Sequence, residues 1–147
     1  MTPYVARYLT VQDIEIFQKI RRLVEALPDN IDLGNDDRGE KIILSCHILV
    51  RALAKLFTLR YRDGYLHPNY RHSWLLTLDG QIIDPYPVAI WGGPLMIDGS
   101  ISSPARWLYL PKSSRIVSSG SFSRPWFQRA VRLITQALRK IEERHSG

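Results

Sequence analysis

The stretch RHSWLLTLDGQIIDP, residues 71 to 85, constrains the fold of this chain more than any other. Its first half alternates apolar and polar side chains, and the Asp79-Gly80 pair that follows is typical of a tight turn between antiparallel strands. The pattern predicts a β-hairpin with His72 near the start of its first strand and Asp84 at the end of its second. Because the start of one strand faces the end of the next, we expect these two side chains to be cross-strand neighbours.

Three amphipathic helices are predicted around this hairpin. Thr10-Val11-Gln12-Asp13 resembles a capping box and opens an apolar pattern at helical spacing, which Pro28 ends. Ser45 is a good N-cap for a second helix, so Cys46 would lie in the first turn of that helix. Pro125 opens the third helix, whose apolar positions recur from Phe127 to Ile141.

Further strands are predicted on both sides of the hairpin. Residues Thr58 to Tyr65 alternate and contain Asp63-Gly64, which indicates a strand with a bend. Two more strands are expected at Arg106 to Leu110 and Arg115 to Val117, and the aromatic pairs Trp107/Tyr109 and Trp126/Phe127 are interpreted as core. The order of helix, helix, strands and helix indicates an α+β fold with an antiparallel sheet.

The size and composition of the chain set the frame for its function. At 147 residues, with 45% hydrophobic and 23% charged residues, the chain is expected to form a single domain spanning 1–147. No apolar run is long enough to cross a bilayer, and the N-terminus lacks the layout of a secretory signal. We therefore expect a cytoplasmic protein without a membrane partner, and we leave open a later export that needs no such signal.

The charge and the metal-binding residue types exclude other classes of function. The formal net charge of +6 is spread along the chain without a run of five or six like charges, so a solvated surface is favoured over a nucleic-acid groove. One cysteine and four histidines show no ligand spacing of a metal site. We expect no metal, no cofactor and no nucleic-acid partner.

Cys46, His72 and Asp84 together have the residue types of a nucleophilic site. A thiol becomes a strong nucleophile as the thiolate, which a helix N-terminus and a neighbouring imidazolium both stabilise. A histidine on an adjacent strand can accept the proton of the thiol and pass it to a leaving group. A carboxylate on the other ring nitrogen would hold that histidine in one tautomer. The predicted hairpin supplies such an oriented base, and Cys46 is the group on which it would act.

The run SCHILVRALAKLFTLRYRDGYLHPNYRHSWLLTLDGQIIDP resembles the core of transglutaminase-like domains, in the papain-like superfamily of cysteine enzymes. That family has a cysteine at the start of a helix, then a strand often ending in Gly-Tyr, a strand opening His-x-Trp and a strand ending in Asp-Pro. Gly64-Tyr65, His72-Ser73-Trp74 and Asp84-Pro85 match in order and roughly in spacing. The resemblance covers residues 45 to 85.

The resemblance implies a papain-like fold, with a nucleophile helix packed on an antiparallel sheet and flanked by N- and C-terminal helices. It also implies acyl transfer through a thioester, with Cys46 as nucleophile, His72 as base and acid, and Asp84 as the orienting carboxylate. Hydrolysis of an amide bond in a protein or peptide is our first expectation, and glutamine deamidation and transglutamination are alternatives. The oxyanion donors would be the Cys46 N–H and a polar group from the upstream loop, such as Asn30 or Asn35. The side chains expected beside the triad or as cleft wall are Trp74, Trp91 and Asn35.

Two other readings of the same sequence stay open. A degenerate member of the superfamily would be a binding or adaptor module, and its thiol pKa would lie near the ordinary value. A basic nucleic-acid-binding module is the other. Of the remaining histidines, His47 is expected at the surface or behind the reacting groups, His67 is the rival base, and His145 lies in the tail. The substrate and the oligomeric state are not indicated by the sequence.

Overall fold

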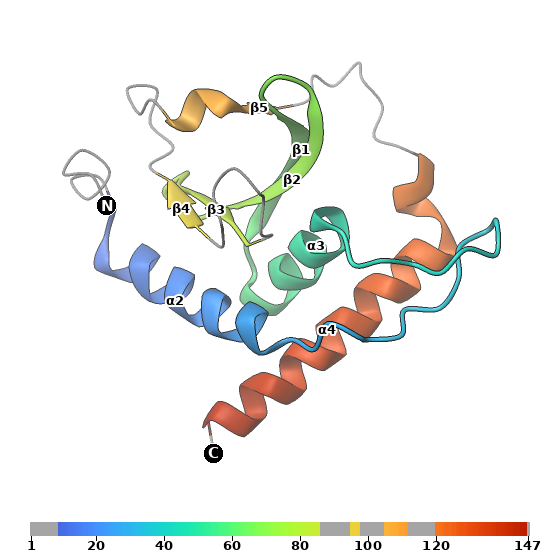
Figure 1. Cartoon of the computed structure of the whole chain (residues 1–147). Coiled ribbons are helices and arrows are strands. Elements are labelled where there is room, and N and C mark those ends of the chain that lie inside the picture. Colours follow the sequence, from blue (N-terminus) through green and yellow to red (C-terminus); the bar gives the residue numbers. More distant parts are fainter. Residues whose placement is uncertain (1–8, 86–94, 98–104, 112–119, 147) are drawn as a thin grey trace.

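The computed structural model describes residues 9–85, 95–97, 105–111 and 120–146. Within these ranges it has an α+β fold of three α-helices and one curled antiparallel sheet of five strands (Figure 1), as the element order predicted. The strand order in the sheet is β4-β3-β2-β1-β5. The α-helices are α2 (Val11–Ala26), α3 (Cys46–Phe57) and α4 (Pro125–Ser146), and the strands are β1 (Arg60–Leu66), β2 (Tyr70–Leu76), β3 (Ile82–Asp84), β4 (Leu95–Ile97) and β5 (Tyr109–Pro111).

The predicted helix starts are confirmed by their caps. At α2 the Thr10 hydroxyl accepts a hydrogen bond from the Asp13 N–H, and the Asp13 carboxylate accepts one from the Thr10 N–H. At α3 the Ser45 hydroxyl accepts a hydrogen bond from the Ile48 N–H at 3.3 Å. This cap fixes Cys46 as the first residue of α3.

The predicted hairpin is β2 and β3, joined by a turn in which Gly80 has a φ of +83°. Its register pairs Leu75 with Ile83 and Leu76 with Ile82. Continued by one residue, this register puts Asp84 opposite Trp74. Asp84 and His72 are therefore diagonal neighbours on one face of the sheet and not directly opposite each other.

The two faces of the sheet belong to two separate apolar clusters. Leu75 and Ile83 point toward the helices, where α3 packs between the sheet and α4 in a core that also includes α2. Trp74 and Ile82, one residue along on each strand, point to the opposite face together with Tyr109 of β5. Among the described residues, no helix combines the length and the apolar character that a membrane span requires.

The strand predicted at Thr58 to Tyr65 is β1, which continues through Asp63-Gly64 without a break. Two sequence-based expectations need correction. Residues Arg106 to Leu110 do not form one strand, since a 3₁₀ turn (η1, Ala105–Leu108) precedes β5. Trp107 is not a core residue: its ring is 56% exposed and stacks under the Arg106 guanidinium at 4.8 Å. The strand expected at Arg115 to Val117 lies outside the described residues.

Gly64 is required in β1 because β5 comes very close there. A Cβ atom at this position would overlap the Leu110 carbonyl oxygen and lie 2.8 Å from Cη2 of Trp74. We expect Gly64→Ala to lower the free energy of unfolding by about 1–3 kcal/mol, as overpacked sites usually do. Urea unfolding checks this, with Arg62→Ala at an exposed position of the same strand as control. Equal midpoints for both variants would contradict the close approach of β5.

Candidate active site

Two consecutive residues at the start of α3 meet two consecutive residues of β2. Side chains that follow one another on a strand point to opposite faces, so His72 and Ser73 leave β2 in opposite directions. The imidazole of His72 and the thiol of Cys46 are close enough to shift each other's pKa, and Ser73 forms a hydrogen bond with the imidazole of His47. The first two residues of α3 therefore meet side chains from both faces of β2.

His72 is held by a buried carboxylate. Its Nε2 donates to Oδ2 of Asp84 at 2.7 Å, and the hydroxyl of Tyr109 donates to the same oxygen at 2.8 Å. His72 and Asp84 are 3% and 0% exposed, so water does not compete for these bonds. Because Asp84 occupies Nε2, the nitrogen of His72 that is left for the Cys46 sulfur is Nδ1. The carboxylate therefore fixes both the tautomer and the orientation of the ring.

The thiol and the imidazole have pKa values shifted in opposite directions. Burial alone would raise the pKa of Cys46, but hydrogen bonds from His47 and His72 outweigh it and lower the pKa from 9.0 to about 6. Burial alone would lower the pKa of His72, but the hydrogen bonds with Asp84 and then Cys46 raise it from 6.5 to about 9. Both shifts favour a thiolate beside an imidazolium over the neutral pair.

The ring of His72 is packed by aromatic side chains on the same face. Trp74 stacks on it with ring centroids 6.3 Å apart, and Tyr109 lies 6.2 Å from it. Trp74 is 1% exposed, so its indole mainly supports the histidine. It also contributes to the wall of a pocket of about 300 Å³ on this face of the sheet. Burial of Tyr109, and then the negative charge of Asp84 beside it, raise the pKa of the Tyr109 hydroxyl. The hydroxyl therefore stays protonated and donates to Asp84.

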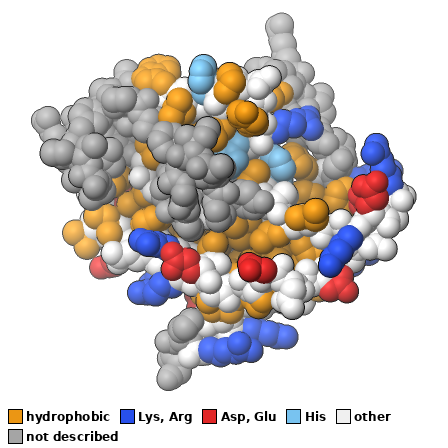
Figure 2. Space-filling view, viewed as in Figure 1, with side chains coloured by type: hydrophobic (Ala, Val, Ile, Leu, Met, Phe, Trp, Pro, Cys, Tyr) orange, Lys and Arg blue, Asp and Glu red, His pale blue; other side chains and the backbone are white. Residues whose placement is uncertain are grey.

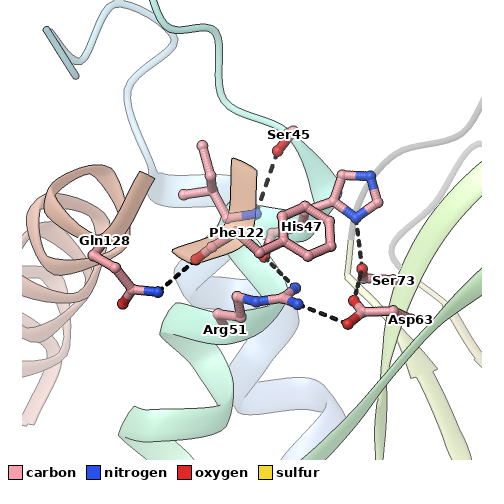
Figure 3. Close-up of polar contacts among 8 residues, drawn as sticks. Ser45, His47, Arg51, Asp63, Ser73, Phe122 and Gln128 are labelled. Carbon is pink, nitrogen blue, oxygen red and sulfur yellow. Dashed lines mark hydrogen bonds and ion pairs between the residues drawn. The ribbon is translucent and has the colours of Figure 1, made fainter. Parts of the chain in front are cut away.

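A second imidazole, that of His47, also lowers the pKa of the Cys46 thiol, and Figure 3 shows its polar contacts. Its Nδ1 is 2.6 Å from the hydroxyl of Ser73, which in turn donates to Oδ1 of Asp63 at 2.6 Å. The guanidinium of Arg51 donates to Oδ2 of Asp63 at 2.7 Å and to the carbonyl of His47 at 3.2 Å. Burial alone would raise the pKa of Asp63, but the hydrogen bonds from Arg51 and Ser73 lower it, so this group is a carboxylate.

A pocket of about 330 Å³ opens beside His47. Phe122 and Trp126 give it an aromatic side, and Lys41 and Arg71 bring positive charge to it. On the face shown in Figure 2, histidine side chains lie among hydrophobic ones, with Lys and Arg nearby. A larger pocket of about 580 Å³ borders the loop after α2, but none of the residues that line it belongs to this group of reactive side chains.

The structure brings together the three residues that the sequence singled out, although Cys46 itself is only 7% exposed. Asn35 is exposed, and its described contacts are made by its backbone, which bridges to Lys41 and accepts from Arg129. Trp91 lies outside the described residues. His67 is exposed in the β1–β2 turn, so the structure gives it no part in the cluster.

Sequence reasoning missed Tyr109 and the chain from His47 to Arg51. Among the described residues, no group of three or more His, Cys, Asp or Glu side chains is placed to hold a metal ion. Comparison with protein-family models, with curated proteins and with solved structures finds no match to this chain.

Proposed function

We propose that the protein is a cysteine-nucleophile acyl-transfer enzyme of the papain-like, transglutaminase-like type. Hydrolysis of an amide bond in a protein or peptide is the reaction that we favour. The observation that carries the proposal is the imidazole of His72, which is bonded to the buried carboxylate of Asp84 and lies close enough to the Cys46 thiol for the two to shift each other's pKa. An adaptor module would have no need of a thiol whose pKa is lowered to about 6.

The acylation step follows from the charges of the pair. The Cys46 thiolate attacks the carbonyl carbon of the amide, and a bond forms between sulfur and carbon. The carbonyl oxygen becomes negative near the N-terminus of α3, where the first backbone N–H groups have no partner within the helix. As the carbon–nitrogen bond breaks, His72 gives its proton to the leaving amine, and a thioester remains on Cys46.

The second step decides the product. Water that attacks the thioester carbon yields a carboxylate, and the sulfur leaves as the thiolate. An amine acceptor gives a new amide instead, and a glutamine side chain as the first substrate gives deamidation when water follows. All three outcomes use the same thioester, so the group that enters the site decides among them.

An activated ester tests the proposal without knowledge of the natural substrate. With p-nitrophenyl acetate, we expect a burst of p-nitrophenolate that is stoichiometric with protein, and an acetyl group on Cys46 by intact mass and peptide mapping. Cys46→Ala should lose both. A wild-type protein that reacts no faster than Cys46→Ala would contradict the proposal and would support the adaptor reading. Added methylamine separates the outcomes of the second step, because hydrolysis releases acetate and transfer releases N-methylacetamide.

A further inference from the structure

His47 has hydrogen bonds and packing that the Cys46–His72–Asp84 triad does not require. One continuous chain of hydrogen bonds of 2.6–2.7 Å runs from Arg51 through Asp63 and Ser73 to the His47 ring (Figure 3). The same ring lowers the pKa of the neighbouring Cys46 thiol. Arg51 itself is 9% exposed. Burying the charge of an arginine costs free energy. Hydrogen bonds from a carboxylate or hydroxyl to one ring nitrogen of a histidine fix the orientation of the ring.

The directions of these hydrogen bonds determine which nitrogen of His47 carries the proton. The Asp63 carboxylate can only accept, so the single proton of the Ser73 hydroxyl goes to Asp63. The oxygen of Ser73 must then accept from Nδ1–H of His47. In the neutral ring, Nε2 therefore has its lone pair available, which is the form of a general base.

The His47 ring is also fixed by packing and lies at an entrance to the site. It packs against Phe122 with ring centroids 5.0 Å apart, and the Arg51 guanidinium lies 4.2 Å from the centroid of the Phe122 ring. The Phe122 carbonyl accepts from Gln128 of α4 at 2.7 Å, which ties this wall to the core. His47 lines the 330 Å³ pocket together with Ser45, so a small acceptor in the pocket can reach the ring next to Cys46 in the chain.

The two imidazoles at the thiol are suited to different steps. His72 is 3% exposed and is bonded through Nε2 to Asp84, so it gives its proton to a leaving amine from a side of the site that is closed to water. The 330 Å³ pocket is lined by Ser45 and His47, the two neighbours of Cys46 in the chain, and not by His72. Water that enters through this pocket therefore meets the His47 ring.

We infer that His47 is the general base of the deacylation step and that Ser73, Asp63 and Arg51 are its positioning residues. This inference rests on the proposed function. Nε2 of His47 takes a proton from water as the water oxygen bonds to the thioester carbon. The carbon–sulfur bond then breaks, the sulfur leaves as a thiolate, and His72 takes up a proton from solvent, which restores the resting pair. His47 releases its proton to solvent through the pocket, and the product acid loses its own proton to become a carboxylate.

The test isolates the second step. Acetyl-enzyme is prepared with p-nitrophenyl acetate, excess reagent is removed, and the hydrolysis of the acetyl-enzyme is followed by intact mass. This design removes the effect of His47 on the amount of thiolate that is available for acylation. We expect His47→Gln to slow this hydrolysis by about 10²–10⁴-fold, the usual contribution of a general base. Hydroxylamine, which needs no base, should release the acetyl group from wild type and variant at equal rates.

Variants of the supporting residues make the test independent of one substitution. Ser73→Ala removes the acceptor of Nδ1–H and should slow the same step by a smaller factor, with the hydroxylamine reaction again unchanged. His67→Gln, in the exposed β1–β2 turn, is the control and should behave as wild type. Equal hydrolysis rates for wild type, His47→Gln and Ser73→Ala would overturn this inference alone. A wild-type protein that forms no acetyl-enzyme would overturn the proposed function as well.

Discussion

Asp84→Asn is expected to slow the acetylation of Cys46 by about 10⁴-fold, the size of effect seen when an orienting carboxylate loses its charge. The physical reason is the position of Asp84, whose Oδ2 accepts from both His72 and Tyr109 in a site that is closed to water. Without the negative charge, the His72 imidazolium is no longer stabilised. The thiol of Cys46 then keeps its proton at neutral pH, and the ring can adopt the other tautomer.

The burst phase with p-nitrophenyl acetate measures this effect directly. Asp79→Asn is the matched control, because it removes the same charge from the exposed turn of the same hairpin. Circular dichroism of both variants at the assay temperature shows whether the fold is retained. A folded Asp84→Asn variant with the burst rate of wild type would mean that Asp84 does not support the chemistry of Cys46.

The pH dependence of stability gives the second large effect, in the variant Cys46→Ser. For His72 the folded-state pKa of about 9 lies above the ordinary 6.5, so its contribution to stability is fully present below pH 6.5 and is lost as the pH rises through 9. For Cys46 the folded-state pKa of about 6 lies below 9.0, so its contribution is present above pH 9 and is lost as the pH falls through 6. Between pH 6.5 and 9, folding of the wild-type protein moves one proton from sulfur to imidazole without net uptake. The pH dependences of the two contributions cancel there, so the stability of the wild-type protein is flat in this range.

Cys46→Ser removes one side of this balance. The hydrogen bond to Asp84, a larger cause of the His72 shift than the one to Cys46, remains in the variant. Relative to wild type, the free energy of unfolding of Cys46→Ser should therefore fall by about 1–3 kcal/mol between pH 6 and 9, at up to 1.4 kcal/mol per pH unit. Urea unfolding of both proteins across this range, with a reductant present, measures the difference. A constant difference would show that sulfur and imidazole do not exchange a proton on folding.

The local features of the site could be predicted from the sequence. Ser45 marks the start of α3 because a hydroxyl at this position satisfies a backbone N–H, and Cys46 follows it directly. The alternation of β2 and the Asp79-Gly80 turn place His72 and Asp84 on one face. The exact register could not be read, so the two residues were expected opposite each other and are in fact diagonal.

Contacts between distant segments had no signal in the sequence. Tyr109 reaches Asp84 because β5 pairs with β1, and nothing near Tyr109 in the chain predicts that pairing. The Asp63-Gly64 pair was interpreted as a bend from its turn propensity. Its glycine is needed for a different reason, the close approach of β5, and its aspartate is needed to bind Arg51 and Ser73.

His47 was misjudged because helix geometry alone sends neighbouring side chains about 100° apart. That geometry is correct, but consecutive side chains of β2, those of His72 and Ser73, also point to opposite faces of the sheet. Ser73 therefore meets His47 as His72 meets Cys46. A sequence gives the direction of a side chain relative to its own helix, and only the packing of that helix on the sheet determines what the side chain meets.

The sulfur of Cys46 is the point on which every proposed step depends, and its ionisation can be measured without a substrate. The measurement is the rate of iodoacetamide alkylation against pH, in wild type and in His72→Ala. The wild-type rate should be half-maximal near pH 6, and His72→Ala should shift that midpoint toward the ordinary value of 9.0. A wild-type rate that rises only near pH 9, and that is the same in His72→Ala, would contradict the thiolate–imidazolium pair.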